Sequence, residues 1–265
     1  MRARRPSRHP DDRAPPVRES SAPAPRIYLG DPLATGATVA LPAAAAHHVA
    51  RVLRLQVGAA LVLFDGRGGE YAAVVSRLAG GVVDVLVGAH RAVEREAPVR
   101  VTLAQGISSG ERMDYTLQKA VELGVAAIQP LATARSVVRL AGERAERRLE
   151  HWRQIVAGAC EQSGRNAVPV VAPIATPSAW LAALAPEAGT LRLTLAPDAA
   201  RRWSELDPAE RVVLAVGPEG GFDPGERDLL AQTGFEAVRL GPRVLRTETA
   251  ALAALAAIHA RWGDF

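Results

Sequence analysis

The feature that most constrains the fold is a regular alternation of short apolar runs with longer helix-like segments over residues 98–265. Each apolar run has the length of a buried strand, and each longer segment is suited to a helix packed against the sheet. Alternation of this kind is typical of an α/β fold with a parallel sheet. The predicted strands are 101–104, 127–131, 191–195, 212–216 and 237–240, and the longer predicted helices are 111–123, 143–162 and 248–262.

Two helix starts carry local signals. Ser108 and Glu111 have the spacing of a capping box, in which each side chain bonds the backbone amide of the other residue. Asp223 is a strong N-cap, with Pro224 at the first helical position and Glu226 at the third. The sequence therefore predicts where two helices of the sheet domain begin.

A smaller unit precedes this domain, over residues 26–92. Its apolar runs are short, and the glycine-rich turn 65–69 between two of them is a hairpin signal. Together with one alanine-rich helical stretch, this pattern is typical of a compact β barrel or sandwich. The charged stretch 91–96 is interpreted as a linker. The strands are expected over 61–64, 71–75 and 82–87, and the helix within 42–55.

Composition limits the class of protein. Apolar residues make up 48% of the chain, which excludes wholesale disorder, and no apolar run approaches the roughly 20 residues needed to span a bilayer. Residues 1–25 are rich in Arg, Pro and Ser and lack the apolar segment of a secretory signal, so we interpret them as a disordered extension. The single Cys160 cannot form an internal disulfide, and the histidines lack metal-ligand spacing. We expect a cytoplasmic protein without a metal.

The charge balance permits a nucleic-acid partner without establishing one. The net charge is +4, and Lys119 is the only lysine among 32 basic residues. A mildly basic, arginine-rich surface suits a phosphate backbone, and it equally suits an ordinary soluble protein. Lys119 and Glu122 have the spacing of an ion pair on one helix face.

Two loops that follow predicted strands are rich in groups that bind polar ligands. Loop 217–222 reads Gly-Pro-Glu-Gly-Gly-Phe, and glycines at the carboxyl end of a parallel strand let backbone groups approach a ligand closely. Loop 240–250 places two arginines, a glutamate and two threonines beside a helix start. By themselves these loops indicate only that a polar ligand could bind at the strand ends. The alternative is an ordinary pair of strand-to-helix turns.

Together the two loops resemble the C-terminal motifs of the bacterial 16S rRNA uridine-N3 methyltransferases, a family of the SPOUT superfamily. Segments 47–54 and 64–66 resemble the family's PUA-like RNA-binding domain. The resemblance covers nearly all of the chain from Arg26 onward, and it departs from the family mainly at 132–134, where the family tends to be more polar. Three central segments also match the family: Arg112-Met113-Asp114 with 118–125, Arg135-Ser136-Val137-Val138, and Glu161-Gln162-Ser163-Gly164-Arg165.

The resemblance implies a catalytic domain over 98–265 tied in a trefoil knot and a PUA-like domain over 26–92. It also implies S-adenosyl-L-methionine as cofactor and a homodimer whose two knots face each other. The implied reaction is methylation of N3 of a uridine in 16S rRNA (uracil 1498) on the small ribosomal subunit, with no membrane and no metal. The implied cofactor-binding residues are Leu195, Ala196, Pro197, Gly217, Pro218, Glu219, Gly220, Gly221, Leu240, Gly241, Arg243, Val244, Leu245 and Thr249.

Methylation of a uracil N3 requires loss of its proton, so a general base or a stabilising cation is expected. Arg246 is the first candidate for orienting the base or its phosphate, with an ion pair to Glu248 or Glu219 as the alternative. Glu248 and Glu219 are the candidate bases; the alternatives are helix-dipole stabilisation for Glu248 and, for Glu219, a clamp on backbone amides or on the dimer partner. Thr249 is expected to bond a ligand or cap a turn. The candidate RNA contacts are Arg51, Arg54, Arg112 and Arg165.

Two other functions stay open at this point. One is a related knotted methyltransferase that acts on another ribosomal base or on tRNA, although the PUA-like motifs argue against the tRNA enzymes. The other is an RNA-binding protein that has lost catalysis, although both loops are intact. A dinucleotide-binding enzyme is excluded, because turn 65–69 lacks the third glycine and is followed by a strand.

Overall fold

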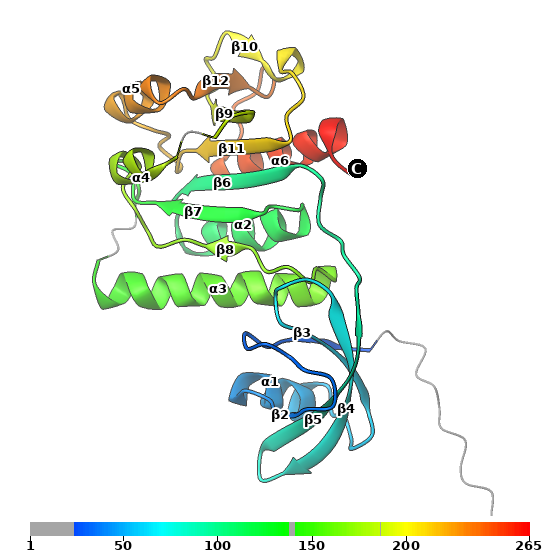
Figure 1. The fold of residues 1–265 in the computed structure, drawn as a ribbon. Coiled ribbons are helices and arrows are strands. Elements are labelled where there is room, and N and C mark those ends of the chain that lie inside the picture. Colours follow the sequence, from blue (N-terminus) through cyan, green and yellow to red (C-terminus); the bar gives the residue numbers. More distant parts are fainter. Residues whose placement is uncertain (1–23, 138–140, 186) are drawn as a thin grey trace, which may run out of the picture.

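The computed structural model describes residues 24–137, 141–185 and 187–265, which build two sheets. In Figure 1 the smaller sheet lies below the larger one, and a long helix runs along the boundary between them. The predicted extension over 1–25 lies outside the described residues, apart from its last two positions.

The smaller sheet confirms the predicted β-rich unit. Its strand order is β1-β3-β4-β5-β2, with β1 parallel to β3 and the other neighbours antiparallel. Val75 and Val85 are buried in its core while Val74 and Leu86 are exposed, which is the two-residue period of a half-buried sheet. The strands are β1 (Arg26–Tyr28), β2 (Thr38–Ala40), β3 (Ala60–Phe64), β4 (Glu70–Ala79) and β5 (Val82–Arg91).

The helix of this unit is shorter and less regular than the sequence predicts. Helix α1 (Ala43–His47) passes into the π-helical turn η1 (His48–Val52), where the Leu53 amide bonds the His48 carbonyl. The wider turn keeps Val49 in the core. The segment ends at Arg54, whose φ of 54° lies in the left-handed region that residues other than glycine rarely adopt.

In the larger sheet each strand runs parallel to its neighbours. The strand order is β10-β12-β9-β11-β6-β7-β8. The five strands predicted from sequence are confirmed to within two residues at each end. Two further strands are only two residues long, too short to leave a periodic signal. The strands are β6 (Arg100–Gly106), β7 (Ala127–Leu131), β8 (Val170–Val171), β9 (Thr190–Leu195), β10 (Arg201–Arg202), β11 (Arg211–Val216) and β12 (Glu236–Arg239).

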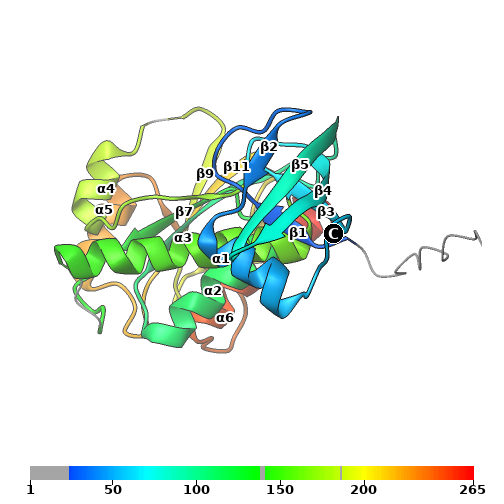
Figure 2. The same cartoon turned by 90° about the horizontal axis from the view of Figure 1, so that it is seen from below.

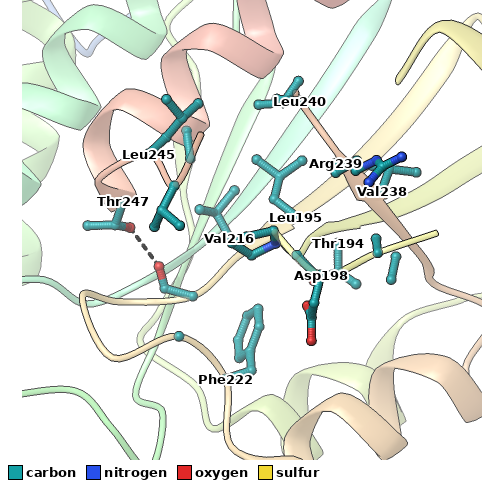
Figure 3. A pocket seen from close by; sticks show the side chains of 18 of the residues that line it. Thr194, Leu195, Asp198, Val216, Phe222, Val238, Arg239, Leu240, Leu245 and Thr247 are labelled. Carbon is teal, nitrogen blue, oxygen red and sulfur yellow. Dashed lines mark hydrogen bonds between the residues drawn. The ribbon is translucent and has the colours of Figure 1, made fainter. Parts of the chain in front are cut away.

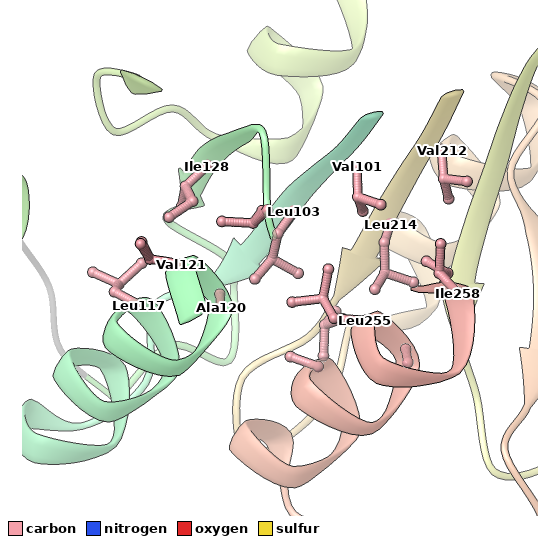
Figure 4. Close-up of a cluster of buried hydrophobic side chains, with 14 of the residues drawn as sticks. Val101, Leu103, Leu117, Ala120, Val121, Ile128, Val212, Leu214, Leu255 and Ile258 are labelled. Atoms are coloured by element: carbon pink, nitrogen blue, oxygen red, sulfur yellow. The ribbon is translucent and has the colours of Figure 1, made fainter. Parts of the chain in front are cut away.

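Helices cover both faces of this sheet. On one face, side chains of α2 and α6 pack against Leu103 of β6 and Leu214 of β11 (Figure 4). On the other face, Ala104 and Ala215 of the same strands join the apolar cluster of α4 and α5. Because both faces are buried, the strands are continuous apolar runs in the sequence. The helices are α2 (Gly110–Glu122), α3 (Glu143–Ser163), α4 (Pro177–Ala183), α5 (Pro224–Gln232) and α6 (Thr247–Trp262), with a 3-10 turn at Trp203–Glu205.

The two predicted helix caps have opposite outcomes. The Asp223 cap is confirmed: its Oδ1 accepts from the Glu226 amide at 2.7 Å, and the Glu226 carboxylate accepts from the Asp223 amide at 2.9 Å. The capping box of Ser108 and Glu111 is wrong. Helix α2 has Ser109 as its N-cap residue, and the amide and hydroxyl of Ser109 both donate to a carboxylate from another loop.

Arg165, which the sequence predicts as an RNA contact, is buried at the boundary of the two sheets. Its side chain is 5% exposed, and Nη1 donates to the carbonyls of Val121 and Val125, each at 2.9 Å. The same guanidinium pairs with Glu96 in the segment that joins the sheets. A guanidinium that is enclosed and paired in this way cannot also hold a phosphate, so the predicted RNA contact is wrong and Arg165 anchors the linker.

A second set of contacts ties strand β1 to the end of α3, which Figure 2 shows passing beside the small sheet. Arg26 pairs with Glu70 within the small sheet and also donates to the Asn166 side chain of the large domain. The Tyr28 amide donates to the Glu161 carboxylate at 2.8 Å. Polar contacts therefore hold the two domains together at strand β1 and at the linker. No helix in the described ranges has the length and apolarity needed to cross a membrane.

We predict that Arg165→Leu lowers the free energy of unfolding by about 3 kcal/mol, because it leaves two carbonyls and Glu96 without their partner. Urea unfolding measures this loss. Arg147→Leu is the matched control, since Arg147 forms an exposed pair with Glu143, and it should change stability by less than about 0.5 kcal/mol. Equal effects of the two substitutions would contradict the structural role of Arg165.

Candidate active site

A cavity of about 850 Å³ opens at the carboxyl ends of β9, β11 and β12. Its size lies within the range of small-molecule sites, and its position is where open α/β sheets bind ligands. Figure 3 shows side chains from the segments after all three strands around one space. All residues that the resemblance implies for cofactor binding line this cavity except Thr249: Leu195, Ala196, Pro197, Gly217, Pro218, Glu219, Gly220, Gly221, Leu240, Gly241, Arg243, Val244 and Leu245.

Thr249 is exposed and lies outside the cavity lining, so its predicted place in the site is corrected. Helix α6 begins at Thr247, and this first threonine is the one that is buried and lines the cavity. A helix turns about 100° per residue, so side chains two positions apart, such as those of Thr247 and Thr249, point to nearly opposite sides. The pattern Arg-Thr-Glu-Thr by itself does not show which threonine points inward.

The loop after β11, residues 217–221, lies against the end of β6 at backbone contact distance. A Cβ on Gly106 would lie 2.5 Å from the backbone nitrogen of Pro218, and a Cβ on Gly217 would lie 2.8 Å from the Cα of Gly221. Neither position therefore admits a side chain, whatever its chemistry. These glycines are needed for close approach, and the loop forms a narrow cradle whose backbone groups face the cavity.

Glu219 holds this loop to helix α2. One carboxylate oxygen accepts from the amide and the hydroxyl of Ser109 and from Arg112, each at 3.0 Å. Partial burial of Glu219 opposes ionisation, but these hydrogen bonds outweigh it and hold the pKa of the carboxyl below its ordinary value. The interpretation of Glu219 as a clamp on backbone amides fits this geometry better than that of a free base, and Arg112 lies at the cavity as its partner.

Arg246 and Glu248 lie on either side of Thr247 at the start of α6, and both line the cavity. Arg246 is exposed, and within the described ranges it forms no ion pair with Glu219 or Glu248. Glu248 keeps one carboxylate oxygen, Oε2, buried without a protein hydrogen-bond partner. A buried acceptor without a partner is costly, so this oxygen can accept a hydrogen bond from water or from a ligand.

Three charged residues of the cavity had no signal in the sequence. Asp198 follows β9 and pairs with Arg227 of α5 at 3.5 Å, and Figure 3 shows its carboxylate in the space beside Phe222. Arg239, at the end of β12, also lines the cavity. None of them lies in a motif, and only the neighbouring positions of β9, β12 and α5 bring them together.

The remaining predicted residues lie apart from the cavity. Arg51 and Arg54 are exposed on the small domain. Their exposure is compatible with an RNA contact and equally with an ordinary solvated surface. The Lys119–Glu122 pair is confirmed at 2.7 Å. Among the residues that the structure describes, no cluster of three His, Cys, Asp or Glu side chains could hold a metal ion.

Comparison with known proteins matches both domains to one family. Residues 95–259 match the RNA methyltransferase domain, and residues 41–85 match the RNA methyltransferase PUA domain. The chain belongs to this RNA methyltransferase family. The family resemblance and the α/β fold with a PUA-like domain, both predicted from sequence, are thereby confirmed.

Several relatives match this RNA methyltransferase over most of its length. A ribosomal RNA small subunit methyltransferase E from Synechocystis is 34% identical over 92% of this chain and 82% of its own. The protein of that name from Neisseria gonorrhoeae, solved with bound S-adenosyl methionine, is 42% identical, with a TM-score of 0.83 over 91% of this chain and 99% of its own. A putative methyltransferase from Legionella pneumophila, solved with the same cofactor, is 39% identical, with a TM-score of 0.87 over 92% of this chain and 100% of its own.

We predict that Glu219→Gln lowers the stability of the methyltransferase by about 1 kcal/mol at pH 7, because the amide loses the charge-assisted bonds to Ser109 and Arg112. The folded-state pKa of Glu219 is lowered, so its contribution is present above the ordinary carboxyl pKa and disappears as the pH falls through the folded value. Urea unfolding of both proteins from pH 7 down to pH 3 measures the difference. A difference that grows toward acid pH would refute this account.

Proposed function

We propose that this chain is an S-adenosylmethionine-dependent methyltransferase that modifies N3 of one uridine in the 16S rRNA of the small ribosomal subunit, in the cytoplasm. The observation that carries the proposal is the cavity at the ends of β9, β11 and β12, lined by the glycine loop and by the start of α6. The names and bound cofactor of its relatives support both the substrate class and the donor.

The cavity fits S-adenosylmethionine in size and chemistry. Leu195, Val216 and Leu240 supply apolar surface for a flat base. The glycine cradle brings backbone groups close to a ligand. When bound there, the cofactor supplies an electrophilic methyl group on a sulfonium.

Two side chains of the α6 start suit the acceptor side of the reaction. The Glu248 carboxylate has a free oxygen to take the proton of the uracil N3, whereas the bonded oxygen of Glu219 is committed to Ser109 and Arg112. Arg246 places an exposed guanidinium beside the same cavity, where it can stabilise the anionic uracil or hold a neighbouring phosphate. We therefore assign Glu248 as the base, Arg246 as the orienting cation and Glu219 as a support of the loop.

The surroundings of the cavity are suited to RNA and to a second subunit. Arg112 at the cavity, with Arg51 and Arg54 on the small domain, provides cations for the phosphate backbone. Val244 lines the cavity although the residue is 81% exposed, and a second copy of the chain would shield it. We propose a homodimer on this basis, and sedimentation equilibrium measures its mass.

The test of the proposed function is to incubate the protein with S-adenosylmethionine and small ribosomal subunits that lack the modification. We expect one methyl group on N3 of a single uridine of 16S rRNA, mapped by mass spectrometry of nuclease fragments. Free 16S rRNA and total tRNA run in parallel. Methylation of another base or of tRNA, or no transfer to any of these RNAs, would overturn the assignment.

We predict that Arg246→Ala lowers kcat/KM for methyl transfer by about 100-fold or more, since it removes a cation from the charge that develops on the uracil. Arg202→Ala is the control, because Arg202 is also exposed but lies outside the cavity lining, and it should retain activity. Both proteins should keep the unfolding temperature of the unaltered chain. Full activity of Arg246→Ala in a primer-extension assay would remove Arg246 from the mechanism.

A further inference from the structure

Behind the glycine loop lies a short chain of hydrogen bonds that is largely buried. Gln105, the penultimate residue of β6, is fully buried, and its Nε2 donates to Thr247 Oγ1 at 2.9 Å and to the Gly106 carbonyl at 3.0 Å. Thr247 Oγ1 donates in turn to the Gly217 carbonyl at 2.6 Å, the bond drawn in Figure 3. The chain joins strand β6, the start of α6 and the cofactor loop.

The direction of this chain is fixed by the number of donors. The Gln105 amide has two hydrogens, and Gly106 and Thr247 take both of them. The single hydroxyl hydrogen of Thr247 is therefore left for Gly217. Reversing the amide would place its oxygen against the Gly106 carbonyl, two acceptors facing each other. A valine at 247 keeps the shape of threonine but supplies no hydrogen for Gly217.

The other side-chain attachments of the loop are more exposed, among them the bond from the Ser109 hydroxyl to Glu219. Arg112 bonds Glu219 with its own side chain 44% exposed, and Arg135 donates to the Gly220 carbonyl at 2.9 Å from an exposed position. Water competes with hydrogen bonds at such positions and weakens them. Thr247 is 7% exposed, so its bond to Gly217 forms away from that competition.

We propose that Gln105 and Thr247 are positioning residues that set the Gly217 loop for the cofactor and link it to the groups that face the uracil. Thr247 lies between Arg246 and Glu248 in the chain, so the bond that fixes the loop also fixes the first turn of α6. Neither residue has to touch the reacting atoms. This inference rests on the proposed function, because it assigns the loop to S-adenosylmethionine.

The test compares Thr247→Val with Thr247→Ser by calorimetric titration of S-adenosylmethionine without RNA. Loss of the two hydrogen bonds of the Thr247 hydroxyl, to Gln105 and to Gly217, should weaken binding by about tenfold or more in the valine variant. The serine variant keeps the hydroxyl and should stay within about threefold of the unaltered protein. Gln105→Met, which removes both donors at similar volume, should weaken binding as the valine variant does. In methyl transfer, Thr247→Val should also lower kcat at saturating cofactor, because the turn that carries Arg246 and Glu248 shifts.

Thr116→Val is the matched control. Thr116 is fully buried in α2 and donates its hydroxyl to the Arg112 carbonyl at 2.8 Å, without a bond to the glycine loop. Its loss should lower the unfolding temperature while leaving cofactor binding unchanged. The inference is overturned if Thr247→Val binds the cofactor as tightly as the unaltered protein does. It is also overturned if Thr247→Val and Thr116→Val lose equal cofactor affinity. Either result leaves the proposed function standing. Failure of the unaltered protein to bind the cofactor overturns the proposed function, and the inference with it.

Discussion

The close contact between the end of β6 and the glycine loop after β11 is the constraint on which the site depends. Gly106 and Gly217 let the two backbones approach to a distance at which no Cβ fits. A hydrogen bond from Thr247 to Gly217 then joins the start of α6 to the same point. Because backbone contact admits little adjustment, the loop, the strand and the helix take one arrangement around the cavity.

Enclosed polar contacts also join the two domains. Arg165 is held by Glu96 and by two carbonyls, and Arg26 bridges Glu70 and Asn166. Removing one partner would leave the others buried and unpaired, so such contacts resist sliding of one domain against the other. The exposed arginines of the small domain are therefore held in a defined relation to the cavity. A substrate RNA that contacts both would meet a fixed surface.

Much of the fold, and part of the site, could be predicted from the sequence because the signals are local. The apolar runs 101–104 and 212–216, the Asp223 cap and loop 217–222 each depend on residues close together in the chain. Where a competing partner came from elsewhere, local signals failed. The helix begins after Ser109 instead of Ser108, and Ser109 bonds Glu219, 110 positions away. The sequence predicts Thr249 at the site, whereas the packing of α6 points Thr247 inward.

The sequence by itself determined the alternation of strands and helices, the β-rich small domain and the two loops at strand ends, since these follow from periodicity, turn residues and glycine. The tertiary structure alone decided which side chains share the cavity and which are buried. Asp198 and Arg227 meet across 29 positions, and Arg165 meets Glu96 across 69. Parallel strands bring distant segments to the same sheet edge, and a periodic pattern carries no record of which strands become neighbours.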